Sequence, residues 1–386
     1  MRKPGLIASM AAVAAAAACL LAASAAHDVR PPSAVVNLAA EPGALAARFE
    51  RALTQAAKAS PDRAFWVGYS IERLQGEHSS IGSYWSGDKV RRLTVADVLA
   101  GRTAPGPASP EDVRGAASAA LARIENEGKP EKLVLKELGF FLKYEPGRPA
   151  GLSQVGMTNL DLSFDFEGAP LYWLGQAPED QSLALVRDLY GRNGTEKVRE
   201  HLIAAAGCHG TPKLVLPFLE SILSGPGADD LRKDAAFWIG QQTDPESLRI
   251  LAKAARSDRA EEVREGAVFA ISELDLPEAV DELIALARGA ERRDVRKQAV
   301  FWLSQIATKK SGPVLAEIAA GDADLEIQEQ ALFALSELPG NEGLEPLIRL
   351  AKTHRDARIR KKAVFWLGES EDPRALEAIV SIVKGK

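Results

Sequence analysis

The C-terminal half of the chain carries a hydrophobic pattern that recurs at a constant step. Each copy is a short run of apolar residues with an aromatic residue near its end, as in Ala299-Val300-Phe301-Trp302-Leu303. The phenylalanines of these runs are 32 residues apart, at Phe237, Phe269, Phe301, Phe333 and Phe365. A second apolar position recurs with the same step, at Leu251, Leu283, Leu315, Leu347 and Ile379. This pattern predicts an array of repeats, each made of a helix, a turn and a second helix.

The phenylalanine lies on an unexpected side of the first helix of each repeat. At about 100° per residue, Val263, Ala267 and Ile271 share one face, and Phe269 points to the opposite, polar face. We therefore expect a row of half-exposed rings that something must cover. Three covers remain open: a partner protein, the N-terminal part of the chain, or the neighbouring tryptophans. We assign partner binding to Phe237, Phe269, Phe301, Phe333, Phe365 and Tyr172.

The position after the phenylalanine alternates between a large and a small residue. Along the chain it is Trp173, Ala205, Trp238, Ala270, Trp302, Ala334 and Trp366. Close packing favours a large side chain against a small one on the neighbouring helix. We therefore expect the tryptophans to form a structural ladder that fills the core, with a true period of two repeats. The copy Tyr172-Trp173-Leu174-Gly175 is taken as the start of the array.

A second structural ladder of arginines flanks the same helices. Its members are Arg232, Arg264, Arg296 and Arg360, with Gln328 in the remaining position. We expect these side chains to bind loop carbonyls or acids in the turns, such as Asp244 and Asp372. Four prolines mark the turn before the second helix of a repeat: Pro212, Pro245, Pro277 and Pro373.

The N-terminal half of the chain follows different patterns. A helical spacing of Leu45, Phe49 and Leu53 predicts a helix within residues 42–59. The segment 64–71 alternates with a period of two and predicts a strand, and further strands are predicted at 133–144 and 160–166. A helix is also predicted at 110–126. We therefore expect a leader and helix at 27–59 and a small α+β domain at 60–168.

The repeat resembles the HEAT-like repeats of the family named after phycobilisome lyases. The short helix of that family reads roughly Val-Arg-x-x-Ala-Ala-x-Ala-Leu-Gly, and here it stands as Val263-Arg264-Glu265-Gly266-Ala267-Val268-Phe269-Ala270-Ile271-Ser272. The resemblance covers about residues 170–386. It implies a mainly α fold, an α-solenoid of HEAT-like helix pairs at 169–386 that is preceded by the small α+β domain. It also implies a binding scaffold, since most relatives with this repeat have that role.

The first 26 residues have the pattern of a secretory signal peptide. Arg2 and Lys3 precede an apolar, alanine-rich run, and small residues at Ala23–Ala26 suit cleavage. We expect export to a bacterial periplasm or exterior, with no membrane insertion after cleavage; a membrane anchor and a lipid anchor at Cys19 remain open. Cleavage would leave 46 basic and 53 acidic residues, a formal charge of −7. We therefore expect no nucleic-acid partner.

Little in the sequence points to catalysis. After cleavage Cys208 would be the one cysteine, and its neighbour His209 would point about 100° away on a helix. The five histidines are scattered, and phosphate-loop and dinucleotide motifs are missing from the sequence. We expect no metal and no cofactor. The leading interpretation is an exported, non-catalytic scaffold that binds an unidentified protein on the inner face of the solenoid. The alternative is an accessory or lyase-like enzyme with its chemistry at Cys208 or in the N-terminal domain.

Overall fold

The computed structural model describes residues 29–59, 61–77, 79–82, 93–103, 132–146, 151–306 and 310–384. Two compact units make up the chain, one ending at Phe218 and the other beginning at Leu219. The predicted signal peptide at 1–26, the lipid anchor at Cys19 and the predicted helix at 110–126 lie outside the described residues. Within the described residues, no helix has the length and apolar character needed to cross a bilayer.

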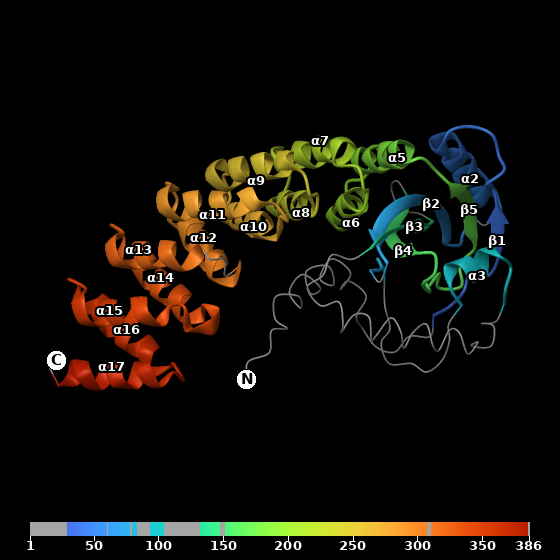
Figure 1. Ribbon diagram of the computed structural model, residues 1–386. Helices are drawn as coiled ribbons and strands as arrows, with labels where there is room; N and C mark the ends of the chain where they lie inside the picture. Colours follow the sequence, from blue (N-terminus) through green and yellow to red (C-terminus); the bar gives the residue numbers. More distant parts are fainter. Residues whose placement is uncertain are drawn as a thin grey trace, which may run out of the picture. The chain divides into compact units, whose positions relative to one another are not determined.

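A mixed sheet forms the centre of the N-terminal unit (Figure 1). Strands β2 and β3 and strands β3 and β4 are antiparallel, whereas β5 lies parallel to both β1 and β2. The order across the described sheet is β1-β5-β2-β3-β4. The strand bounds are β1 (Val35–Asn37), β2 (Phe65–Gly76), β3 (Leu133–Tyr144), β4 (Leu152–Asn159) and β5 (Leu171–Gln176).

Apolar residues cover both faces of this sheet. On one face, Phe49 of α2 (Leu45–Ala59) has its ring centroid 6.1 Å from that of Tyr144. On the other face, Trp66, Phe141 and Phe166 pack together with Val95 of the short helix α3 (Val95–Leu99). The predicted strand at 64–71 is therefore confirmed in β2, which is buried on both faces at its N-terminal end.

Two sequence predictions for this unit are wrong. Residues 160–166 do not form a strand; they cross the sheet as an irregular segment that places Phe164 5.2 Å from Trp66, centroid to centroid. The alternating pattern there reflects side chains that point into the core from a loop. Residues 171–176, interpreted as the first repeat, form strand β5 inside the sheet, so the first helix of the helical region is α5 (Glu179–Arg192).

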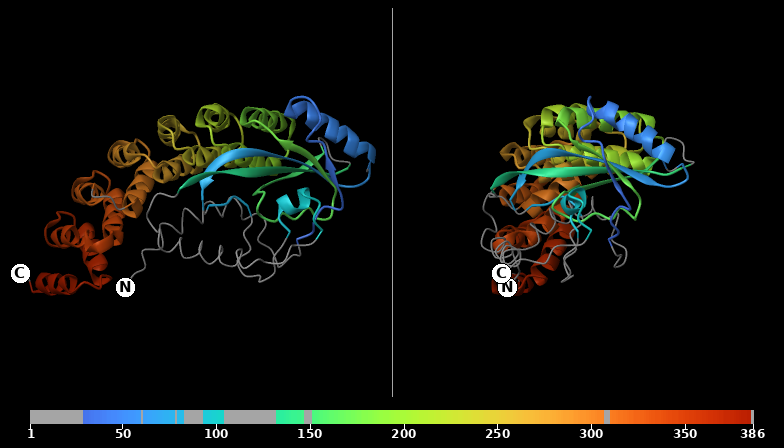
Figure 2. Two further views of the ribbon diagram at one scale, coloured as in Figure 1. Left: turned by 45° about the vertical axis from the view of Figure 1, so that its right-hand side comes forward. Right: turned by 90° about the vertical axis from the view of Figure 1, so that its right-hand side faces the viewer.

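In the C-terminal unit, helices alternate between two layers to the end of the described chain (Figure 1 and Figure 2). In the C-terminal unit, α8, α10, α12, α14 and α16 contact one another in sequence and form one layer, and α11, α13, α15 and α17 form a second layer with α9. The first layer lines the inner side of the curve that this unit makes in Figure 1. The bounds are α6 (Glu196–Gly207), α7 (Pro212–Leu223), α8 (Asp229–Gly240), α9 (Pro245–Ser257), α10 (Glu261–Glu273), α11 (Pro277–Gly289), α12 (Arg293–Ile306), α13 (Ser311–Gly321), α14 (Leu325–Glu337), α15 (Leu344–Thr353), α16 (Ala357–Gly368) and α17 (Pro373–Val383), with a 3-10 turn at Pro339–Asn341.

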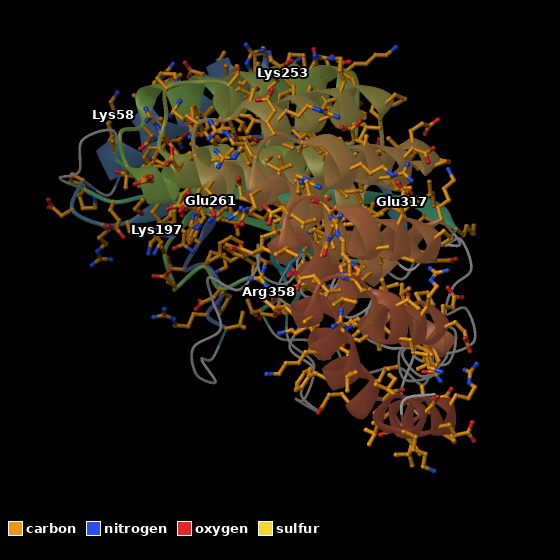
Figure 3. All side chains as sticks on the ribbon, turned by 90° about the vertical axis from the view of Figure 1, so that its left-hand side faces the viewer. Lys58, Lys197, Lys253, Glu261, Glu317 and Arg358 are labelled. Carbon is orange, nitrogen blue, oxygen red and sulfur yellow. The ribbon has the colours of Figure 1, made fainter. Side chains whose placement is uncertain are left out.

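The repeating positions explain why this array is regular. Helices α7, α9, α11 and α17 begin at prolines, whose fixed φ and missing N–H suit the first helical position. Residues Leu251, Leu283 and Leu315 are fully buried between the layers. Charged side chains are exposed on both layers, and Figure 3 shows Lys253 and Glu317 of the outer helices and Arg358 of the inner helix α16 among them. The predicted fold class, a mainly helical solenoid after a small α+β region, is confirmed.

The arginine positions join each inner helix to nearby loops. Arg232 is almost fully buried, and its Nη1 donates to Asp258 at 2.9 Å. Arg264 Nε donates to Asp294 at 2.7 Å and Arg296 pairs with Asp322, while Arg360 donates to the carbonyl of His354. In the fourth of these positions, Gln328 donates to the carbonyl of Asp322.

The acids suggested from the sequence have another role. Asp244 and Asp372 are the N-caps of α9 and α17, where each accepts a backbone N–H two residues ahead. Hydrogen bonding to the Arg374 guanidinium lowers the pKa of Asp372 to about 2.

Candidate functional site

Aromatic rings form a stripe along the inner layer of the C-terminal unit. We call Phe237, Trp238, Phe269, Phe301, Trp302, Phe333, Phe365 and Trp366 the aromatic stripe. The ring of Phe237 is stacked on that of Phe269, with centroids 6.4 Å apart. Phe269 contacts Trp302 at 4.9 Å, and Trp302 contacts Phe301 at 5.0 Å. The same arrangement recurs two repeats later, where Trp366 lies 5.3 Å from Phe333 and 4.9 Å from Phe365.

The tryptophans are part of this stripe and do not fill the core. Trp238, Trp302 and Trp366 are each partly buried, whereas the alternating Ala270 and Ala334 are buried. Each of the indoles of Trp302 and Trp366 lies against the phenylalanine of the preceding inner helix. The prediction of core filling is therefore wrong for these residues, which are partly exposed and contact the phenylalanine rings of the stripe at tilted angles. The alternation does give the array a period of two repeats, 64 residues.

The stripe retains exposed apolar surface and unused hydrogen-bond donors. Phe365 is 52% exposed, and Phe237, Phe269, Phe301 and Phe333 are partly buried. The indole N–H groups of Trp302 and Trp366 have no hydrogen-bond acceptor among the described residues. The nearby serines are occupied, since Ser272, Ser304 and Ser336 each donate to the carbonyl of the phenylalanine three residues earlier.

A row of alternating charge runs beside the aromatic stripe. We call Lys233, Glu265, Lys297, Glu329 and Lys361 the charge ladder; each member lies four residues before its phenylalanine and so on the same side of its helix. Lysines occur on the helices that carry tryptophan, and glutamates on those that carry alanine. Our sequence analysis missed this ladder, although its constant step of 32 residues is visible in the sequence.

The stripe ends beside a cleft of about 500 Å³ that is lined by residues of α14, α15, α16 and α17. Trp366, Leu338 and Leu347 supply an apolar wall. Glu337 and Glu369 supply carboxylates at its rim and are exposed. The cleft adjoins the stripe at Trp366, and its accessible lining is more polar than apolar.

Two residues assigned from the sequence do not belong to this surface. Tyr172 and Trp173 lie in β5, where they are 3% and 7% exposed. Tyr172 packs edge-on against Phe65, 5.8 Å between centroids, and Trp173 belongs to the core around Trp66. The prediction that Tyr172 binds a partner and that Trp173 starts the tryptophan ladder is wrong, because a strand can carry the same short string as the repeat helix.

The junction of the sheet with the first helices contains a buried Ser–His pair. The Oγ of Ser182 is 2.8 Å from Nε2 of His209 and 3.0 Å from the hydroxyl of Tyr69. Nδ1 of His209 faces the carbonyls of Ala205 and Ala206, so it carries the proton and Nε2 accepts from Ser182. Burial lowers the pKa of His209 and raises that of Tyr69. Because all three side chains are at most 1% exposed, substrate cannot reach the pair, and its role is structural.

Cys208 lies in the same junction. Its side chain is buried, and its carbonyl accepts a hydrogen bond from Arg73 Nη1 at 2.6 Å. A reactive thiol must be accessible to its substrate and must lie in an electropositive environment. The burial of Cys208 prevents access to its sulfur. The described residues hold no group of three or more His, Cys, Asp or Glu side chains that could bind a metal ion.

The stacked helix pairs define an α-solenoid that repeats every 32 residues. Residues 216–304 and 312–386 match the family model of HEAT repeats, and this part of the chain is therefore a HEAT-repeat array. The predicted resemblance to HEAT-like repeats is confirmed. No curated protein matches the chain in sequence.

Solved structures are similar to the array at low sequence identity. Human deoxyhypusine hydroxylase in complex with glycerol is 19% identical over 51% of this chain and 76% of its own, with a TM-score of 0.23. The CpcE and CpcF complex of phycocyanin lyase from Nostoc sp. PCC7120 is 17% identical over 48% of this chain and 97% of its own, with a TM-score of 0.24. The S. pombe condensin Cnd3-Cnd2 subcomplex is 18% identical over 54% and 31%, with a TM-score of 0.31.

Proposed function

We propose that this protein is an exported, non-catalytic scaffold that binds another protein through the aromatic stripe. A HEAT-repeat solenoid is in general suited to protein binding, because the stacked helices present one long surface. The observation that supports this particular surface is the recurrence of partly exposed aromatic rings in the same place on consecutive inner helices, with Phe365 half exposed at the end. Aromatic residues are the side chains that most often dominate the binding energy of protein interfaces. Export, to a bacterial periplasm or exterior, rests on the signal-like residues 1–26.

The tryptophans cover the rings in part, and Phe365 remains half exposed. Two of the indoles hold their N–H groups without an acceptor, which is a cost of about 1–3 kcal/mol for a buried donor. A partner that supplies a carbonyl oxygen after a small rotation of the indole would remove this cost. Partial cover by tryptophan and binding of a partner are therefore compatible.

The alternative is an accessory or lyase-like enzyme that uses Cys208 or the N-terminal unit. The burial of the Cys208 side chain argues against a thiol mechanism. If alkylation of Cys208 under native conditions abolished function while the protein stayed folded, the alternative would be favoured over the scaffold.

The scaffold is tested with two matched surface changes. Phe365→Asp places a charge in the aromatic stripe, and Leu376→Asp places one at a similarly exposed position on α17, outside the stripe. Both positions are more than half exposed, so both variants should fold. The mature protein is cross-linked to its surroundings in the exporting cell, and cross-linked partners are identified by mass spectrometry.

We expect one partner to be cross-linked by the wild type and by the Leu376→Asp variant, and to be lost, by about tenfold or more, from the Phe365→Asp variant. A tenfold loss corresponds to about 1.4 kcal/mol, a cost that only a minority of interface residues reach. Equal recovery from all three proteins would show that the stripe is not the binding surface.

A further inference from the structure

Most members of the charge ladder make no side-chain polar contact with the described part of the array. Glu265, Lys297, Glu329 and Lys361 form no ion pair and no side-chain hydrogen bond with other described residues, and Lys233 pairs only with Asp230 on its own helix, at 3.1 Å. Neighbouring members have opposite charge but do not reach one another, since the ion pairs of the described residues include none between them. The alternation is therefore available to a binding partner.

The opposite flank of the stripe lacks this alternation. The residues four positions after each phenylalanine are Gln241, Glu273, Gln305, Glu337 and Glu369, which are neutral or acidic. Neutral and acidic residues alternate on this flank as far as Glu337, but only the flank with the charge ladder alternates between positive and negative charge over all five helices. Along each helix this ladder lies about 6 Å from the stripe, four residues at 1.5 Å each, so the two form parallel tracks.

The spacing of the helices limits the conformation of an occupant. Packed helices are about 8–10 Å apart, so the backbone positions of consecutive ladder members repeat at about this distance, whereas the rings of Phe237 and Phe269 lean toward each other and lie 6.4 Å apart. A polyproline II segment advances about 9.3 Å per turn of three residues, which brings every third side chain to one side. In a β-strand the side chains on one face repeat at about 6.6 Å, and in an α-helix positions i and i+7 repeat at about 10.5 Å. The polyproline II repeat is the one that falls within the range.

We propose that the aromatic stripe and the charge ladder together bind an extended, proline-rich segment of the partner in the polyproline II conformation. Every third residue of the segment carries a charge, alternating acid and base opposite Lys233, Glu265, Lys297, Glu329 and Lys361. Its prolines lie on the rings of the stripe, as such segments do in aromatic-lined grooves. This inference rests on the proposed function, because it specifies the partner of the same surface.

A synthetic peptide tests the inference directly. It has thirteen residues, with aspartate at the first, seventh and thirteenth positions, lysine at the fourth and tenth, and proline elsewhere. This charge order reads the same in both directions, so one peptide tests both orientations. The control peptide has the same composition, with its three aspartates first and its two lysines last among the charged positions. Binding of fluorescein-labelled peptides to the mature protein is measured by fluorescence anisotropy at low and high salt.

We expect the alternating peptide to bind at least about fivefold more tightly than the control, with the difference reduced at high salt. Lys297→Glu should weaken binding of the alternating peptide about fivefold, the equivalent of ~1 kcal/mol for one reversed surface pair. A peptide with lysine at the central position should bind this variant more tightly than it binds the wild type. Lys253→Glu, on the outer layer, is the matched control and should change none of these affinities.

Three outcomes would overturn the inference: no binding of the alternating peptide, equal binding of the two peptides, or an Lys297→Glu variant that loses thermal stability but keeps the wild-type preference. The last would assign the charge ladder to stabilising the array. If the peptide fails and Phe365→Asp still abolishes cross-linking of the natural partner, the scaffold function stands and only the polyproline segment is wrong.

Discussion

His209 shows how one buried residue couples the stability of the N-terminal unit to pH. It contacts the ring of Phe140 at 5.4 Å, Ser182 and two carbonyls, with Glu179 and Arg73 as the nearby charges. Burial is the largest influence and lowers the pKa of the imidazole below its ordinary value of 6.5. Below about pH 6.5 the imidazole is therefore protonated in the unfolded chain but still neutral in the folded unit. Because the unfolded state binds more protons, the free energy of unfolding decreases as the pH falls below about 6.5.

We expect the melting temperature of the wild type to fall between about pH 7.5 and about pH 5.5, and His209→Gln to flatten this dependence. His201→Gln is the comparison: burial and the charge of Lys197 lower the pKa of His201 too, but this side chain is only partly buried, so its substitution should flatten the dependence less than that of the fully buried His209. Thermal unfolding followed by circular dichroism gives the comparison. The same slope for the wild type and a folded His209→Gln variant would assign the dependence to other groups.

Residue-scale predictions from the sequence succeeded where geometry alone decides. The helical wheel placed Phe269 opposite Val263 and Ala267, and Phe269 is partly exposed while the other two are fully buried. It did not place Trp302, because the wheel locates Cβ and the indole extends well beyond it. The charge ladder was not predicted, although its spacing is present in the sequence, because a single lysine or glutamate on a helix surface is common.

At the scale of the helix, the glycine that ends some inner helices is closely packed in one repeat and free of contacts in another. A Cβ at Gly240 of α8 would lie 2.9 Å from Cβ and from the carbonyl oxygen of Ala270 on α10. The equivalent Gly368 of α16 has no atom within 4 Å of such a Cβ. The glycine is therefore required where α8 approaches α10 and is dispensable at α16.

We expect Gly240→Ala to destabilise the protein by about 1–3 kcal/mol through overpacking, and Gly368→Ala to be neutral or stabilising by up to about 1 kcal/mol through helix propensity. Urea unfolding measures both. An equal effect of the two changes would mean that the contact of α8 with α10 relaxes without cost.

Element boundaries were predicted well only where a period was sustained. The repeat helices and β3, at Leu133–Tyr144, agree with the predicted elements. The prediction of a strand at 160–166 was wrong, because Phe164 and Phe166 alternate in a loop that covers Trp66. Strand β4, which precedes this loop, was not predicted. The string Tyr172-Trp173-Leu174-Gly175 was too short to distinguish a strand from a helix. It pairs in parallel with both β1 and β2, contacts that no local pattern reveals.

At the scale of the molecule, the sequence predicted two kinds of architecture but placed their boundary differently. The compact N-terminal unit extends to Phe218 and contains α5 and α6 with the sheet. Contacts distant in sequence hold these helices there, such as Ser182 with Tyr69 and Arg73 with Cys208. A boundary drawn from composition cannot include such contacts.

Because the inner helices alternate with a period of two repeats, removing an odd number of repeats differs from removing an even number. Deleting residues 261–292 would place the helix of Trp238 and Lys233 directly before that of Trp302 and Lys297, large beside large and positive beside positive. Deleting 261–324 would instead join it to the helix of Ala334 and Glu329, which preserves the alternation.

We therefore expect the protein that has lost two repeats to melt at a higher temperature than the one that has lost a single repeat, although a solenoid ordinarily gains stability with each unit. Calorimetry of the two deletions makes the comparison, and the usual order of stability with length would contradict it. If this difference holds, arrays of this kind can lengthen or shorten by whole pairs of repeats, and an odd change must be followed by substitutions at both alternating positions before the chain packs well again.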